Sequence, residues 1–263
     1  MPANNRQFSL ALDALAELKT EPQTPPLRSQ PMPAAPSFDS VLAQIGPLPR
    51  EALLLGVASD GLPVLLNLHD PTPGPVLLIG DAGAGKTNFL QLTARAIAIT
   101  HSPDEVQFGV ISNRPDEWND LEQTPHRVGV FPSHHTDAKE LIHSLTAWAH
   151  SNKNRRQSVL LLIDELESVA SMDSAALQNL RWLLSHGSAR RVWLFFTVNA
   201  NRYGHVISWI PAFRTRIFGR IEDERAAAAL GADVASGVGR LDAGIQFSLR
   251  ENGDWIRFWL PSC

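Results

Sequence analysis

Cysteine is almost missing from this chain, since Cys263, the last residue, is the only one among 263. A single cysteine excludes an internal disulfide framework and suits the reducing cytosol. No apolar run approaches the roughly 20 residues that a membrane-spanning helix requires. Residues 1–8 also lack the charged-then-apolar layout of a secretory signal. We therefore expect a cytoplasmic protein without a membrane span.

Other signatures are absent as well. The formal net charge is −4, with a pI of about 6.1, so the average composition does not indicate nucleic-acid binding. The nine histidines are not spaced as zinc ligands, and no segment is repeated. Hydrophobic residues make up 44% of the chain, which is ordinary for a globular protein. The length suits one sizeable domain with appendages.

The N-terminal stretch differs in composition from the rest. Apolar residues recur at helical spacing in residues 1–20, which predicts an amphipathic helical arm. Residues 21–37 contain six prolines and predict an extended linker. An arm that docks on the body or on a neighbouring subunit fits this pattern, and so does a solvated tail. We expect the folded domain to comprise residues 38–263.

Within that domain, apolar strand patterns alternate with helical patterns. Such alternation predicts an α/β fold with a mainly parallel central sheet covered on both faces. A small N-terminal β-hairpin is expected at residues 53–68 and a C-terminal one at residues 245–259, each around a Gly-containing turn. Sheet strands are expected at residues 76–79, 107–112, 127–131, 158–163, 191–198 and 216–221, and helices at 88–99, 138–150 and 175–184.

A complete G-x-x-x-x-G-K-[ST] pattern lies between the first of these strands and its helix. Its glycines let successive N–H groups point at phosphate oxygens, and the following helix adds its N-terminal dipole. Lys86 is expected to contact the β- and γ-phosphates, and Thr87 to ligate Mg²⁺. The sequence therefore predicts a site for a nucleoside triphosphate with Mg²⁺, formed by Gly80, Asp81, Ala82, Gly83, Ala84, Gly85, Lys86, Thr87 and Asn88.

Polar residues follow two further strands. Asp164 and Glu165 come directly after the apolar run at residues 159–163. Beside a phosphate loop, Asp164 would hold Mg²⁺ and Glu165 would deprotonate the attacking water. After the strand at residues 191–198, either Thr197 or Asn199 could sense the γ-phosphate and hold the water. The spacing does not choose between them, and both could simply begin a polar loop.

Arginine is concentrated in residues 181–220, a stretch without any Asp or Glu. A block of one sign suggests an anionic partner. That partner could be a phosphodiester backbone, or the γ-phosphate of a neighbouring subunit reached by an arginine finger. Pairing with acidic residues 165–173 or 222–224 of the same chain is the alternative. The arginines are Arg181, Arg190, Arg191, Arg202, Arg214, Arg216 and Arg220.

Together these segments resemble the FtsK/SpoIIIE motor domain. The similarity covers roughly residues 51–260 and includes Leu55-Gly56-Val57, the phosphate loop, Ile163-Asp164-Glu165-Leu166 and Pro211-Ala212-Phe213-Arg214-Thr215-Arg216-Ile217. It implies a RecA-like P-loop ATPase that assembles as a ring, usually hexameric, and moves double-stranded DNA with ATP hydrolysed at subunit interfaces. Arg214 or Arg216 would act in trans.

The chain also departs from that family's pattern. It contains neither a membrane-spanning region nor a winged-helix DNA reader, and residues 197–202 replace the usual Gln-Arg-Pro. We expect residues 38–263 to be an FtsK-like ATPase domain that acts on double-stranded DNA as a homo-oligomer. Its hydrolytic residues would be Lys86, Glu165, Asn199 and Arg216, with Thr87 and Asp164 on Mg²⁺. The alternatives are an ATPase that powers protein secretion and a nucleotide-dependent assembly switch with little turnover.

Overall fold

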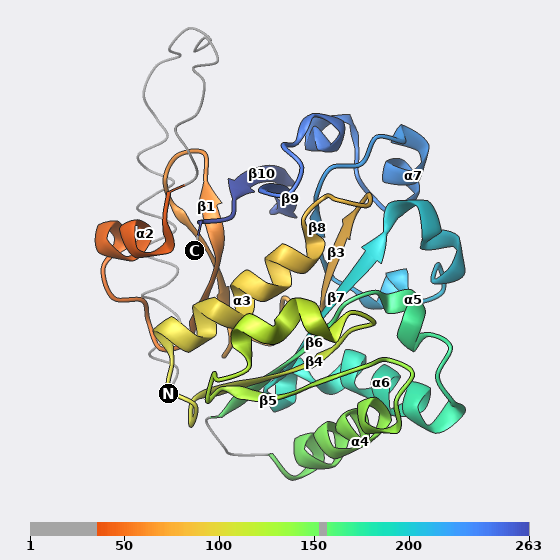
Figure 1. The fold of residues 1–263 in the computed structure, drawn as a ribbon. Coiled ribbons are helices and arrows are strands. Elements are labelled where there is room, and N and C mark those ends of the chain that lie inside the picture. The colour runs from red at the N-terminus through yellow and green to blue at the C-terminus, as the bar shows by residue number, and fades with distance from the viewer. Residues whose placement is uncertain (1–35, 153–156, 263) are drawn as a thin grey trace, which may run out of the picture. The chain divides into compact units, whose positions relative to one another are not determined.

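A computed structural model describes residues 36–152 and 157–262 (Figure 1). The arm expected at residues 1–20, and the linker expected at 21–37 apart from its last two residues, lie outside this described part. Both remain predictions.

In the described part of the chain, ten strands form one sheet in the order β2-β1-β10-β9-β8-β3-β7-β6-β4-β5. Strands β8, β3, β7, β6, β4 and β5 run parallel to one another, as the sequence predicts, whereas β9 is antiparallel to β8. The strands are β1 (Ala52–Ala58), β2 (Pro63–Asn67), β3 (Val76–Gly80), β4 (Val106–Ile111), β5 (Arg127–Phe131), β6 (Ser158–Ile163), β7 (Val192–Asn199), β8 (Thr215–Phe218), β9 (Gln246–Glu251) and β10 (Asp254–Trp259).

The two predicted hairpins are present, and they extend the central sheet. β1 pairs with β2, and β9 with β10, both antiparallel. The hairpins also join each other through β1 and β10, and β9 pairs with β8. Gly56 is required at the junction, because a Cβ there would lie 2.5 Å from the Phe258 ring and 2.7 Å from the Trp259 carbonyl oxygen. Only glycine lets β10 approach β1 this closely.

Helices cover both faces of the parallel part (Figure 1). α3 (Lys86–Thr100) packs on one face, and the unpredicted α2 (Phe38–Ile45) joins the same core beside β1. α4 (Thr136–Ser151) and α6 (Ser174–His186) pack on the other. Neighbouring residues of one strand contribute to opposite cores, as Leu161 and Leu162 of β6 do. A strand buried on both faces reads as a continuous apolar run, which explains why β6 was predicted to the residue.

Several short elements have no clear signal in the sequence. α5 (Leu166–Val169) and α7 (Glu224–Ala229) are one to two turns long. The 3₁₀ segments η1 (Pro115–Leu121), η2 (Ser188–Arg190), η3 (Ala200–His205), η4 (Ile210–Ala212), η5 (Val234–Ser236) and η6 (Val238–Arg240) connect the longer elements. Within the described residues, no helix combines the length and the apolar character that crossing a bilayer requires.

Candidate nucleotide site

The phosphate-loop residues connect β3 to α3, as predicted. Gly83 and Gly85 adopt positive φ angles of 77° and 89°, a conformation that glycine adopts without strain. A Cβ on Gly85 would also lie 2.6 Å from the backbone of Gly244, in the segment that precedes β9. Asn88 donates a side-chain hydrogen bond to the Gly244 carbonyl oxygen at 3.2 Å. The segment that leads into the C-terminal hairpin therefore packs directly on the loop.

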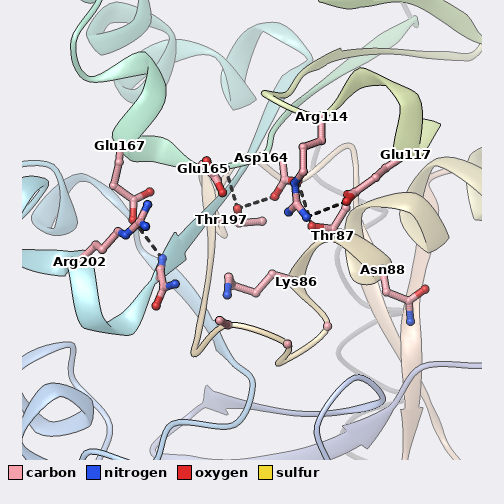
Figure 2. A pocket seen from close by; sticks show the side chains of 14 residues that line it. Lys86, Thr87, Asn88, Arg114, Glu117, Asp164, Glu165, Glu167, Thr197 and Arg202 are labelled. Carbon is pink, nitrogen blue, oxygen red and sulfur yellow. Dashed lines mark hydrogen bonds and ion pairs between the residues drawn. The ribbon is translucent and has the colours of Figure 1, made fainter. Parts of the chain in front are cut away.

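Lys86 lies between the loop and the acidic side chains (Figure 2). Its Nζ donates to the carbonyl oxygens of Gly80 at 2.9 Å and Asp81 at 2.7 Å. Burial lowers the pKa of Lys86, while the charges of Asp164 and Glu167 act in the opposite direction. These carbonyl groups hold a positive charge where the triphosphate of a bound nucleotide would lie.

Thr87 and Asp164, which are 77 positions apart, are in direct contact. Thr87 Oγ1 donates to Asp164 Oδ2 at 2.9 Å, and Thr197 Oγ1 donates to Asp164 Oδ1 at 2.8 Å. Hydroxyl and carboxylate oxygens are ligands that Mg²⁺ accepts, with phosphate oxygens and waters filling its remaining positions. The described residues contain no group of three or more His, Cys, Asp or Glu that could hold a metal alone. The donor set thus fits a magnesium ion brought with a nucleotide.

Glu165 has a strained backbone. Its φ of 75° is unusual for a residue other than glycine, and such strain is concentrated at functional sites. The Glu165 N–H donates to Thr197 Oγ1 at 2.8 Å, and its Oε2 accepts from Asn113 Nδ2 at 3.0 Å. The residue is therefore fixed at its backbone by Thr197 of β7 and at its carboxylate by Asn113, which follows β4.

The two sensor candidates have different surroundings. The Thr197 side chain is fully buried, and its hydroxyl joins Asp164 to the backbone of Glu165. Asn199 lines the pocket, and its N–H donates to Glu167 Oε1 at 3.2 Å. Thr197 thus braces the acidic pair, while the Asn199 side-chain Oδ1 accepts from the Asn201 N–H at 3.2 Å.

The pocket has a volume of about 360 Å³, within the size range of small-molecule sites. Three charged lining residues have no role in the sequence analysis: Arg114, Glu117 and Glu167. Arg202, which the sequence names only as part of the arginine block, also lines the pocket. Arg114 Nη1 pairs with Glu117 Oε1 at 2.7 Å, and burial raises the pKa of Glu167. Figure 2 shows Arg114 on one side of Lys86 and Arg202 on the other. Arg114 follows the end of β4, and ligands of α/β sheets bind at such ends, so its position was an available signal.

Arg216 is not among the residues that line this pocket. Its guanidinium donates to the carbonyl oxygens of Leu230 at 3.0 Å and Ile210 at 3.2 Å, and burial lowers its pKa. A role in a neighbouring subunit would require both bonds to break. Arg214 is exposed, and its guanidinium has no hydrogen-bonding or ionic partner in the described part of the chain.

The other arginines of the block are spread over the domain. Arg220 pairs with Glu222 at 3.1 Å, which is the intramolecular alternative that the sequence left open. Arg191 donates to the Leu68 carbonyl oxygen at 3.4 Å, and Arg181 lies over the Trp209 ring at 5.0 Å. The arginines of the block are therefore close together in the sequence but not in the folded domain.

Comparison with known proteins identifies the family. The FtsK/SpoIIIE family model matches residues 49–191, which is more than half of the chain. The chain belongs to the FtsK/SpoIIIE family. It is a P-loop ATPase motor domain of the FtsK/SpoIIIE type, and the resemblance expected from the motifs is confirmed. Among proteins with curated descriptions, none matches this FtsK/SpoIIIE domain.

Solved structures share its fold. ATPases 2 and 3 of Thermomonospora curvata EccC, in complex with a signal sequence peptide, superpose with a TM-score of 0.68 at 16% identity, covering 98% of this chain and 48% of that one. Geobacillus thermodenitrificans EssC (ATPases 2 and 3) gives 0.65 at 13% identity, covering 92% and 48%. The pCW3 conjugation coupling protein TcpA, a monomer form with ATPγS, gives 0.68 at 13%, covering 88% and 70%.

At these identities the similarity shows the fold alone, and this confirms the predicted RecA-like α/β architecture. The FtsK/SpoIIIE domain spans about half the length of the EccC and EssC chains that it matches.

Proposed function

We propose that this FtsK/SpoIIIE domain binds MgATP at residues 80–88 and hydrolyses it. The observation that carries the proposal is the 2.9 Å hydrogen bond between Thr87 and Asp164, which brings the phosphate loop to the acidic end of β6. A hydroxyl and a carboxylate in contact at this place are suited to share one Mg²⁺ beside the β- and γ-phosphates.

The reaction would be an in-line attack of water on the γ-phosphorus. Glu165 accepts the proton of the attacking water. The bond between the γ-phosphorus and the oxygen that bridges the β- and γ-phosphates breaks, and ADP and phosphate leave. Bound Mg²⁺ would supply positive charge that stabilises the phosphate oxygens. Lys86 contributes a second positive charge, and Asn199 orients the water. Because phosphoryl transfer needs little covalent help, positioning and charge account for most of the catalysis.

The arginines near the site have separate roles in this proposal. Arg114 and Arg202 line the pocket of their own subunit, where they would neutralise phosphate charge. Arg214 is the better candidate for action in trans within a ring, because it is exposed while Arg216 is held by two carbonyl groups.

Double-stranded DNA is the proposed load of the motor, meaning the molecule that ATP hydrolysis would move. Arg190 lies two residues before β7 and Arg214 directly before β8, the two strands that flank β3, so both lie at the N-terminal ends of these strands, opposite the nucleotide. Neither guanidinium has a polar partner in the described residues, so Arg190 is free to contact a phosphodiester backbone, and Arg214 would do so as the alternative to its role in trans. TcpA is named as a conjugation coupling protein. A polypeptide load is the second candidate, because EccC was solved with a signal sequence peptide.

Steady-state ATPase assays on the full chain test the proposal. Lys86→Ala should lose nucleotide binding, whereas Glu165→Gln should bind ATP and lose turnover. Turnover of Glu165→Gln at the wild-type rate would refute the assignment of the base. Ring formation under excess ATP without turnover in the wild type would instead favour the assembly switch.

The same assay separates the two loads. Duplex DNA should stimulate turnover, and the stimulation should weaken steeply as salt rises, since phosphate contacts release counterions. Stimulation by an unfolded polypeptide and not by DNA would favour a secretion ATPase.

A further inference from the structure

Asn113 holds the carboxylate of Glu165. Asn113 lies two positions beyond the last residue of β4, the strand next to β6 in the sheet. Its Nδ2 donates to Glu165 Oε2 at 3.0 Å. The bond therefore links the ends of two adjacent strands at the point where Glu165 reaches into the site.

Ser133 contacts the other end of the Asn113 amide. Ser133 is buried and lies two positions beyond the end of β5, and its hydroxyl donates to Asn113 Oδ1. An amide turned by 180° would place its oxygen against the Glu165 carboxylate, where two acceptors repel. Only the observed orientation makes the contact with Glu165 attractive, because an ionised carboxylate accepts only, whereas a serine hydroxyl can donate or accept. Glu165 therefore sets which end of the amide faces it, and Ser133 holds the amide in that orientation.

The backbone of Glu165 is held from the opposite side. Its N–H donates to Thr197 Oγ1 on β7, at a φ of 75°. With the backbone fixed by β7 and Oε2 fixed by Asn113, the side chain has little rotational freedom left. Oε1 is the oxygen that remains available to accept a proton.

We infer that Asn113 is a positioning residue for hydrolysis, which it serves by directing the Glu165 carboxylate, and that Ser133 acts through Asn113. The inference rests on the proposed function, in which Glu165 is the general base. A base contributes to the rate only when it lies within hydrogen-bond reach of the proton that it accepts. Asn113 and Ser133 themselves touch neither water nor nucleotide in this scheme.

Asn113→Asp is the sharpest test, because it keeps the shape and the acceptor for Ser133 and replaces the donor that faces Glu165. We expect kcat to fall on the order of 10- to 100-fold with KM for ATP within about twofold of wild type. Asn113→Ala should also lower kcat. Ser133→Ala should lower it less, and adding Ser133→Ala to Asn113→Ala should cause no further loss, as expected of residues that act in series.

Thr146→Val is the matched control, since it deletes a buried hydroxyl that bonds within α4, away from the pocket. Its kcat should equal that of the wild type. Wild-type kcat in Asn113→Asp would overturn the inference. So would equal losses of kcat and ATP binding, which a disturbed fold would produce.

A spectroscopic measurement tests the contact without hydrolysis. The side-chain amide NMR signal of Asn113, assigned by its loss in Asn113→Ala, should move in Glu165→Gln and in Ser133→Ala but not in Thr146→Val. An unmoved signal in Glu165→Gln would overturn the inference. If the wild type hydrolyses ATP no faster than Lys86→Ala, the proposed function fails, whereas the amide signal still decides whether Asn113 holds Glu165.

Discussion

At the scale of single residues, the hydroxyl of Thr197 connects the Asp164 side chain to the backbone of Glu165. It donates to Asp164 Oδ1 and accepts from the Glu165 N–H, each at 2.8 Å, inside a fully buried environment. Two polar groups therefore depend on one oxygen. A buried donor or acceptor that loses its partner costs about 1–3 kcal/mol.

We predict that Thr197→Val, which keeps the volume and removes the hydroxyl, lowers the free energy of unfolding by about 1–3 kcal/mol. Turnover should fall more than tenfold, because Asp164 and Glu165 both lose a support. Urea unfolding and steady-state ATPase assays measure the two effects. Thr197→Ser retains the hydroxyl and should remain close to wild type in both. Full activity in Thr197→Val would show that the acidic pair does not need this bond.

His101 makes the stability of the fold depend on pH. Its ring is buried after the end of α3, with Nδ1 within 2.8 Å of Thr100 Oγ1 and Nε2 without a hydrogen-bond partner in the described residues. Burial lowers the pKa of His101 below its ordinary value of about 6.5, although the Arg50 backbone and Glu105 partly oppose this. At a pH well above 6.5, His101 is neutral in both the folded and the unfolded chain.

Below pH 6.5 or so the unfolded chain takes up a proton that the folded chain resists, so stability falls as the pH falls towards the folded pKa. For this one group the slope cannot exceed about 1.4 kcal/mol per pH unit. We predict that the free energy of unfolding, measured in urea, differs less between pH 7.5 and pH 5.5 in His101→Gln than in the wild type. An identical difference in the two proteins would assign the pH dependence to other groups.

At the scale of elements, the sequence predicts those parts whose signal is local. β6 is a continuous apolar run, and the phosphate loop carries its own pattern, so both were found. α7 was missed because a six-residue alanine-rich segment has no amphipathic period, and its position depends on packing of Ala226 and Ala227. The joining of the two hairpins depends on contacts between residues about 200 positions apart, such as Val57 with Trp259. No local pattern reports such a pairing.

The site shows the same division. Thr87 and Asp164 were predicted as partners because each belongs to a motif with a known task. The bracing role of Thr197 could not be read from spacing, because it depends on how β7 lies beside β6. The engagement of Arg216 depends on carbonyl groups near residues 210 and 230, which no charge pattern reveals.

The junction of the hairpins can be tested through Gly56. A Cβ at this position would meet both the Phe258 ring and the Trp259 carbonyl oxygen, and the latter is backbone that cannot rotate away. We predict that Gly56→Ala lowers the free energy of unfolding by about 1–3 kcal/mol, as overpacking does. Gly204→Ala is the control, since no atom lies within 4 Å of its Cβ position. Equal stability of the two variants in urea would mean that β10 shifts without cost.

At the scale of the whole molecule, the distribution of charge decides how subunits would cooperate. Of the arginines in residues 181–220, most are engaged within their own chain, through carbonyl groups, Glu222 or the Trp209 ring. Arg214 is exposed, and its guanidinium has no polar partner within residues 36–152 and 157–262. An assembly that completes its active site in trans needs a cation of this kind, because a guanidinium already bound within its own chain would first have to be released.

Mixing two inactive variants tests this arrangement. Arg214→Ala keeps an intact Glu165, and Glu165→Gln keeps an intact Arg214. If Arg214 acts in trans, each variant alone is inactive and an equal mixture regains activity, because about one interface in four pairs an intact Glu165 with an intact Arg214. A mixture of Arg216→Ala and Glu165→Gln is the control. Its activity should not exceed the activity that the Arg216→Ala variant shows alone. If Arg214→Ala alone keeps its basal rate and loses only stimulation by duplex DNA, Arg214 contacts the load and not the neighbouring nucleotide.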